Sequence, residues 1–230
     1  DPHRAGRAVR VRDRALEDRV AEVILGLVRQ RLERPGLRPG LLGGDPRLHS
    51  RVERLASQWM LFAHIRFVFD NAPDAQVRIA FERGASWSYL GTDALDPTFG
   101  PDDPTMNFGW FTPATANDEL QRVVLHEFGH ALGLIHEHQS PAAQIPWNRE
   151  AVYEYYAGPP NYWSVAQVDH NIFQRYDHTQ ANSSAFDPAS IMLYPIPPEF
   201  TDGKLSVGWN RTLSPIDRDF IGQLYPASGQ

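Results

Sequence analysis

The sequence predicts an α+β fold built around a mixed, twisted β-sheet. Segments with the alternating apolar pattern of strands occur in the first half of the chain, whereas helical patterns predominate in the second half. The strongest amphipathic pattern, at residues 118–133, predicts the main helix. The chain has 230 residues, of which 42% are hydrophobic, so it is long enough to bury a sizeable core.

The N-terminal part is set apart by its composition. Residues 13–33 follow helical spacing, and residues 35–44 are rich in proline and glycine. We therefore predict a helical N-terminal extension over residues 1–44 and a second domain over residues 45–230. Residues 8–12 are an alternative first strand of the sheet.

The elements after residue 44 are expected in the following order. Asp45 and Pro46 suit the N-cap and the first position of a helix. Ser214 is the expected cap of the last helix. The predicted elements are a helix at 45–62, strands at 65–69 and 77–81, a loop at 84–104, a strand at 105–111, the main helix at 118–133, short helices at 148–157 and 165–176, an irregular stretch at 195–212 and a closing helix at 215–225.

Composition excludes several classes of site. The chain contains no cysteine, which excludes disulfides, thiolate metal sites and a cysteine nucleophile. No run of 18 apolar residues occurs, so we expect no membrane-spanning helix. The arginine-rich first 54 residues are interspersed with acids and the remainder is acidic, so we expect no nucleic-acid partner.

The main helix carries a metal-binding pattern. His126 and His130 are four residues apart, so both imidazoles leave one face of the helix a single turn apart and can reach one ion. Glu127 lies beside the first ligand, where its carboxylate can reach a water on the metal. Gly133 can end the helix and turn the chain, so that His136 returns as the third ligand. Three histidines leave one coordination position open, which is typical of a catalytic zinc site with a single ion.

The eleven residues from His126 to His136 resemble the long zinc motif of the metzincin clan of metallopeptidases. The clan also has a methionine-containing turn, for which Met192 is the candidate. Tyr194, two residues further on, resembles the tyrosine that binds zinc or stabilises the oxyanion in astacins and serralysins. A packed tyrosine without either role is the alternative. The resemblance implies a metzincin-like fold, with the active-site helix over a mostly helical or irregular C-terminal subdomain that begins near residue 134.

The resemblance is nearest to cysteine-free, astacin-like peptidases of bacteria and fungi, and it covers about residues 45–226. Glu137 directly follows the third histidine, as in astacins. The alternatives are a serralysin-like or matrixin-like peptidase, or a zinc hydrolase that acts on another amide. The implied activity is hydrolysis of peptide bonds, with Glu127 as general base and acid. Asp187 is either a hydrogen-bond acceptor that orients the turn or a plain turn residue.

Substrate binding and regulation are expected from the same resemblance. Metzincins bind an extended peptide along an edge strand, for which residues 105–111 are the candidate. Asn107, Gly109 and Trp110 are expected to line the cleft, although Trp110 could equally be a core residue. Residues 1–44 are either a structural extension, which we favour, or a pro-segment that covers the site. Such an enzyme is expected to be secreted.

Overall fold

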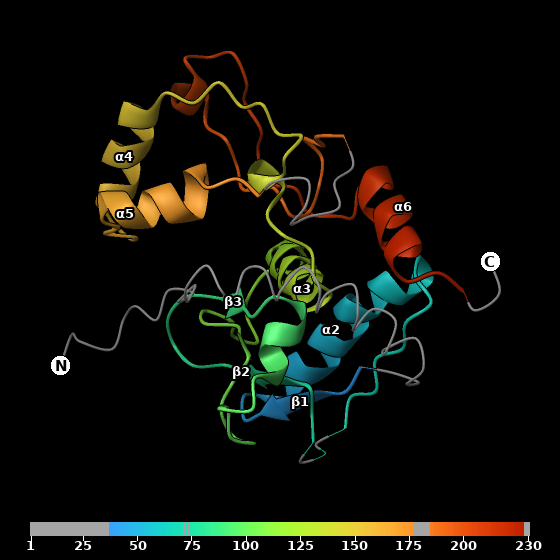
Figure 1. Ribbon diagram of the computed structural model, residues 1–230. Coiled ribbons are helices and arrows are strands. Elements are labelled where there is room, and N and C mark those ends of the chain that lie inside the picture. Colours follow the sequence, from blue (N-terminus) through green and yellow to red (C-terminus); the bar gives the residue numbers. More distant parts are fainter. Residues whose placement is uncertain (1–36, 71, 73, 177–184, 228–230) are drawn as a thin grey trace. The chain divides into compact units, whose positions relative to one another are not determined.

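The computed structural model describes residues 37–70, 72, 74–176 and 185–227. The helix expected at 13–33 and the alternative strand at 8–12 lie outside these residues, so the predicted division at residue 44 stays a prediction. The fold is α+β with a mixed sheet, as predicted (Figure 1). The described chain forms two compact units. The first unit consists of the residues up to Leu134 together with those from Asp217 onward. The second unit is Ile135–Ile216.

The sheet of the first unit has the strand order β1-β2-β4-β3. β1 (Pro39–Leu42) pairs in parallel with β2 (Val77–Ala80), which pairs in parallel with β4 (Met106–Asn107). β3 (Trp87–Ser88) is antiparallel to β4, so β1 and β3 are the two edge strands of the described sheet.

Three expectations about the sheet were wrong. The proline- and glycine-rich residues before Asp45 include β1, whose strand shape comes from pairing with β2 rather than from its own sequence pattern. Residues 65–69 make only one bridge, between Leu37 and Phe67. The loop at 84–104 contains both β3 and the 3₁₀ helix η3 (Gly91–Leu95), so β4 is an inner strand and not the substrate-binding edge.

The helices of the first unit agree closely with the sequence pattern. α2 (Pro46–Ala56) begins at the N-cap Asp45, whose side chain accepts from the main-chain N–H of Arg47, and the 3₁₀ helix η2 (Ser57–Leu61) continues it. α3 (Asn117–Ala131) packs against α2 and also contacts β3. The last helix, α6 (Pro215–Leu224), belongs to this unit from Asp217 onward.

Side chains from α2 and η2 hold α3 in place. The buried indole of Trp59, in η2, donates to the carbonyl oxygen of Leu125 at 3.1 Å. Arg51 donates to the carbonyl oxygens of Pro113 and Thr115, and to the side chain of Asn117 at the start of α3. The helix that carries two of the three histidines is thus fixed at its beginning and its middle.

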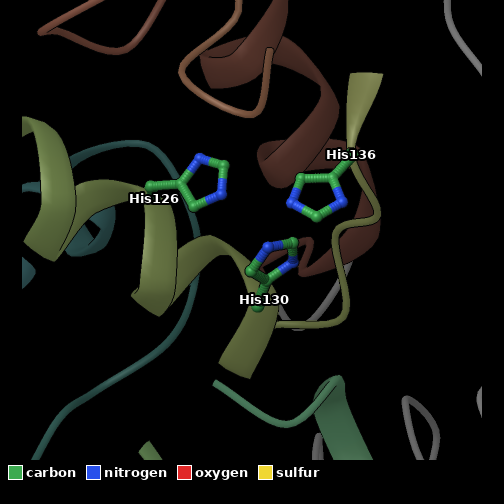
Figure 2. Close-up of side chains that lie close together, drawn as sticks. All are labelled: His126, His130 and His136. Atoms are coloured by element: carbon green, nitrogen blue, oxygen red, sulfur yellow. The ribbon is translucent and has the colours of Figure 1, made fainter. Parts of the chain in front are cut away.

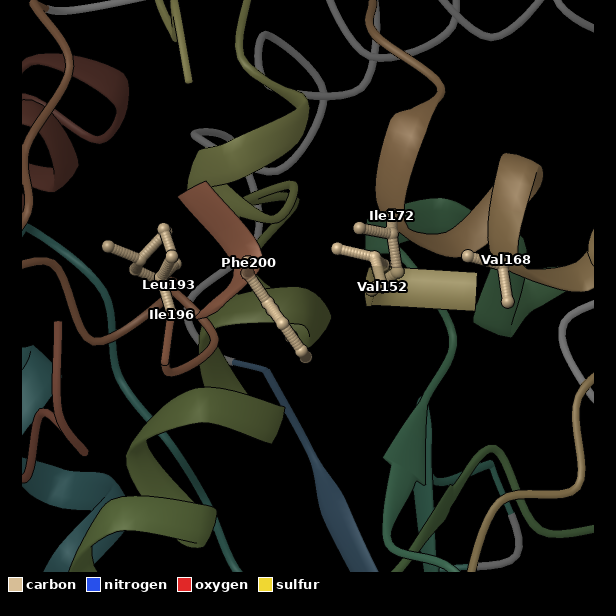
Figure 3. Packing of buried hydrophobic residues seen from close by; sticks show 6 residues of the cluster. All are labelled: Val152, Val168, Ile172, Leu193, Ile196 and Phe200. Carbon is tan, nitrogen blue, oxygen red and sulfur yellow. The ribbon is translucent and has the colours of Figure 1, made fainter. Parts of the chain in front are cut away.

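The second unit has a small core of its own. Its elements are the 3₁₀ helices η4 (Glu137–Gln139) and η6 (Pro198–Thr201), the helices α4 (Arg149–Ala157) and α5 (Val165–Val168), and the π-helical turn η5 (Asp169–Phe173). The expected helices at 148–157 and 165–176 are therefore present, the second in two parts. Figure 3 shows the buried apolar cluster of this unit, to which α4, α5, η5 and η6 contribute together with two residues that precede η6: Val152, Val168, Ile172, Leu193, Ile196 and Phe200.

Candidate metal centre

Two of the three predicted ligands lie on the last turns of α3. The rings of His126 and His130 are 4.7 Å apart between centroids and almost perpendicular, and both side chains are buried. The Nδ1 of His130 lies 2.8 Å from the carbonyl oxygen of Leu134. Because a carbonyl only accepts, Nδ1 carries the proton and Nε2 is left to bind a metal. Burial lowers the pKa of His130 to about 4, so its imidazole is neutral at physiological pH.

The end of α3 explains how the chain returns to the site. Gly133 has φ of +93°, a conformation that other residues adopt at a cost. Its N–H donates to the carbonyl oxygen of His130, and the N–H of Leu134 donates to that of Gly129. This pair of bonds is a Schellman motif. The hydroxyl of Tyr225 also donates to the carbonyl oxygen of Leu132, so the last residues of the first unit brace the turn.

The turn brings the third histidine to the first two. One ligand atom from each of His126, His130 and His136 lies within 4.8 Å of the others. Figure 2 shows the three rings facing a common point. Three convergent imidazoles, of which two are buried and the third half-buried, are a donor set that suits zinc. The residues present therefore fit one zinc ion, as the sequence predicted.

Glu127 lies on α3 directly after the first ligand and is buried. Burial raises the pKa of its carboxyl group to about 8, and the charge of Arg122 partly counteracts this rise. A carboxyl whose pKa lies near neutrality can both accept and return a proton at physiological pH.

The methionine and tyrosine expected near the site lie in the second unit with the third ligand. Met192 is buried, and its carbonyl oxygen accepts from the main-chain N–H of Glu137 at 3.1 Å. The ring of Tyr194 lies 4.3 Å from that of His136, and it is half-buried. Asp187 accepts hydrogen bonds from Ala189 and from the hydroxyl of Ser214, which was expected to cap α6. Asp187 therefore orients the turn that precedes Met192.

Two residues next to the third ligand have contacts that the sequence did not suggest. His138, expected near the surface or cleft, is buried. Its ring stacks on that of His136 with 5.1 Å between the ring centroids, and its Nε2 donates to the carbonyl oxygen of Asn171. Gln139 is also buried, and its Oε1 lies 3.2 Å from Nδ1 of His136. Their position three residues or fewer after a ligand was the only available signal.

The three expected cleft residues differ in their surroundings. The buried amide of Asn107 is occupied by the main chain, because it accepts from the N–H of Glu82 and donates to the carbonyl oxygens of Glu82 and Ala85. Gly109 packs so tightly against Gly84 that a Cβ would lie 2.1 Å from the carbonyl oxygen of Gly84. Trp110 is 45% exposed, and its indole donates to Glu119. Trp110 is thus not a core residue.

The fold, the three-histidine site and the helix that carries two of its ligands define a zinc-dependent metalloendopeptidase of the metzincin type. The family model described as Matrixin matches residues 46–157. A solved structure of myroilysin shares 47% sequence identity with the chain and has a TM-score of 0.80, covering 84% of this chain and 93% of that one. The chain belongs to this family of metzincin zinc metalloproteases, which confirms the resemblance seen in the sequence.

Two further solved structures are similar. A crystal structure of myroilysin shares 45% identity with a TM-score of 0.63, covering 84% of both chains. High choriolytic enzyme 1, a hatching enzyme zinc-protease from the medaka fish Oryzias latipes, shares 17% identity with a TM-score of 0.55, covering 83% of this chain and 90% of that one. At 17% identity, the likeness to high choriolytic enzyme 1 concerns the fold alone. No curated protein matches the chain. None of the described helices is long and apolar enough to span a membrane.

Proposed function

We propose that this endopeptidase cleaves unstructured polypeptides with Glu127 as its general base and general acid. The observation that carries the proposal is the position of Glu127. It is buried on the helix that supplies two ligands, directly after His126, with its pKa raised to about 8. A carboxyl held directly beside the first ligand is placed to accept a proton from a metal-bound water and to return it.

Zinc, when bound, supplies a Lewis acid that polarises the scissile carbonyl and lowers the pKa of water to about 7. Glu127 then takes the proton of the attacking water, holds it in a buried environment and passes it to the nitrogen of the leaving amine. No covalent bond between enzyme and substrate is needed. The neutral imidazole of His130 stays available as a ligand throughout, because its burial disfavours protonation.

Tyr194 is proposed as the donor to the oxygen of the scissile carbonyl and as a further zinc ligand. Its ring contacts both His136 and His138, at centroid distances of 4.3 and 5.3 Å. A phenol that lies this close to the third ligand can supply a hydrogen bond where negative charge develops. Met192 is proposed as the apolar support of the same turn.

The substrate is proposed to add a strand to the sheet along β3. β3 is one of the two edge strands of the described sheet, and it contacts α3, which carries Glu127. Main-chain hydrogen bonds along an edge recognise an extended peptide with little regard to its side chains, which favours broad specificity. Of the three cleft candidates, Trp110 has the exposed surface needed to contact a peptide, whereas Asn107 and Gly109 act by shaping the loop at residues 82–86.

We also infer that the enzyme is secreted and that residues 1–44 are a structural extension rather than a pro-segment. A peptidase of broad specificity must be kept from the cell's own unfolded chains, and release from the cell achieves this. The measurement is to look for the protein in the medium and in the cells that produce it. We expect the mature chain in the medium, and no form other than a precursor in the cell fraction.

The general-base role is tested with the zinc-loaded protein and an unstructured polypeptide such as casein. Glu127→Gln preserves the shape of the side chain but cannot exchange the proton, so cleavage should fall by at least about 100-fold while zinc content stays at one ion per chain. Tyr194→Phe should lower kcat and leave zinc content unchanged. Equal cleavage by the Glu127→Gln variant and the parent enzyme would refute the proposal.

A further inference from the structure

The third ligand, His136, differs from His130 in how its ring is held. His130 bonds through Nδ1 to the main-chain carbonyl of Leu134, a partner that any residue at that position would provide. The Nδ1 of His136 instead faces a side chain, the Oε1 of Gln139, at 3.2 Å. This hydrogen bond of the third ligand therefore depends on the identity of the side chain at position 139.

Local geometry places that residue over the ring. His136 precedes the 3₁₀ helix η4, and the N–H of Gln139 donates to the carbonyl oxygen of His136 at 3.0 Å. His136 is the N-cap of this turn and Gln139 is its third residue, and the two side chains meet within hydrogen-bond distance. Only 8% of Gln139 is exposed, which means that its amide needs partners within the protein.

The orientation of the amide follows from its second partner. Nε2 of Gln139 donates to the carbonyl oxygen of His170 at 3.1 Å. A carbonyl only accepts, so the NH₂ group must face His170, and the amide oxygen must face His136. Because that oxygen also only accepts, Nδ1 of His136 must carry the proton. The lone pair is then on Nε2, the atom left to bind zinc.

The anchor of Gln139 lies in the π-helical turn η5. The last carbonyls of a helix have no N–H partner within it, and two of them accept side chains from η4. The carbonyl of His170 accepts from Gln139, and that of Asn171 accepts from Nε2 of His138. The main-chain carbonyl of Gln139 also accepts from the N–H of Tyr176. The segment from η5 to Tyr176 thus determines where the amide of Gln139 lies.

We propose that Gln139 is a positioning residue that holds His136 in the tautomer protonated on Nδ1 and so presents Nε2 to zinc. It transmits the position of η5 to the third ligand. The inference rests on the zinc-peptidase function in one respect only, that His136 is a ligand. The tautomer itself belongs to the metal-free protein and can be measured whether or not the enzyme cleaves peptides.

The first test needs no substitution in Gln139. Long-range ¹H–¹⁵N spectra of the metal-free protein distinguish a protonated from an unprotonated imidazole nitrogen, and His136→Asn assigns the signal. We expect a single neutral tautomer of His136, protonated on Nδ1. A predominance of the Nε2-protonated form, or an even mixture of the two, would overturn the proposal.

The second test separates the effect of the hydrogen bonds of Gln139 from the effect of its packing. Gln139→Leu keeps the volume but removes both hydrogen bonds, whereas Gln139→Glu keeps the acceptor for Nδ1 and loses the donor to His170. Gln144→Leu, at an exposed position in the same segment, is the matched control. Zinc affinity is measured by competition with a chelator. Thermal unfolding of each metal-free variant reports on folding.

We expect Gln139→Leu to show both tautomers of His136 and to bind zinc about 10–100-fold more weakly. Gln139→Glu should retain the Nδ1-protonated tautomer and bind zinc within about threefold of the parent, and Gln144→Leu should match the parent in both respects. If the folded Gln139→Leu variant kept both the tautomer of His136 and the zinc affinity of the parent, the positioning role of Gln139 would be refuted. Failure of the parent to bind zinc would instead refute the enzyme assignment, and would leave the tautomer result intact.

Discussion

The main-chain N–H of Glu137 donates to the carbonyl oxygen of Met192 at 3.1 Å, and this bond ties the residue after the third zinc ligand to the methionine turn. A second link joins the same two segments, because Oε1 of Glu137 accepts from the N–H of Asp187 at 2.9 Å. Asp187 is buried and bonded to Ser214. The acid that follows His136 is therefore a structural clamp within the second unit.

Loss of this clamp should weaken the second unit. Glu137→Ala leaves the buried N–H of Asp187 without its acceptor, which should destabilise the protein by about 1–3 kcal/mol. The turn around His136 should loosen with it, so zinc affinity should fall as well. Urea unfolding and chelator competition measure the two effects. Glu150→Ala, at an exposed position of α4, is the control, and a stability equal to that of this control would contradict the prediction.

The turn at Gly133 should be sensitive to any side chain. A Cβ at this position meets no atom within 4 Å, so the cost of Gly133→Ala comes from φ of +93° alone. We expect a loss of about 1–2 kcal/mol in stability and weaker zinc binding through displacement of His136. Gly208→Ala also adds a methyl group in open space, but without positive φ, and should be neutral or slightly stabilising. Equal unfolding midpoints for the two variants would contradict the argument.

Glu127 should make the stability of the zinc-free protein depend on pH. Its folded-state pKa is raised to about 8 from the ordinary 4.5. Between these values the folded chain holds a proton that the unfolded chain has released, so stability falls as pH rises through this window, by at most about 1.4 kcal/mol per pH unit. Above about pH 8 the penalty is complete.

Comparison with Glu127→Gln isolates this effect, because the variant has no such proton and the contribution of His130 is common to both proteins. The stability advantage of the variant over the parent should grow from pH 5 to pH 8 and then level off. Urea unfolding of both chelated proteins at several pH values is the measurement. A difference that does not change with pH would show that Glu127 keeps an ordinary pKa.

The N-terminal residues should be separable from the fold only up to β1. β1 pairs in parallel with β2, and Leu37 is buried and bridged to Phe67. Removal of residues 1–36 should therefore leave a folded, zinc-binding chain, whereas removal of residues 1–44 should abolish folding because the sheet loses a strand. Circular dichroism and zinc content distinguish the two truncations.

Peptidase assays on the shorter truncation address the pro-segment hypothesis. Higher activity than that of the full chain would support a pro-segment, and unchanged activity would support a structural extension. A folded product from removal of residues 1–44 would contradict the structural role assigned to β1.

The sequence by itself determined the chemistry of this protein. The spacing of His126, Glu127 and His130 is local, since one turn of helix is enough to bring the two imidazoles together, and Gly133 marks the turn that returns His136. The helices α2, α3 and α6 were also predictable, because amphipathic spacing and caps such as Asp45 are local signals.

Only the tertiary structure decided the rest, because it depends on pairing between distant segments. β1 lies in a proline- and glycine-rich stretch and is a strand because β2 pairs with it. β3 becomes an edge of the described sheet because it pairs with β4 alone. The clamp between Glu137 and Asp187 spans 50 residues, and the anchor of Gln139 on His170 spans 31. No local pattern encodes such contacts, since they form only when the chain brings the two segments together.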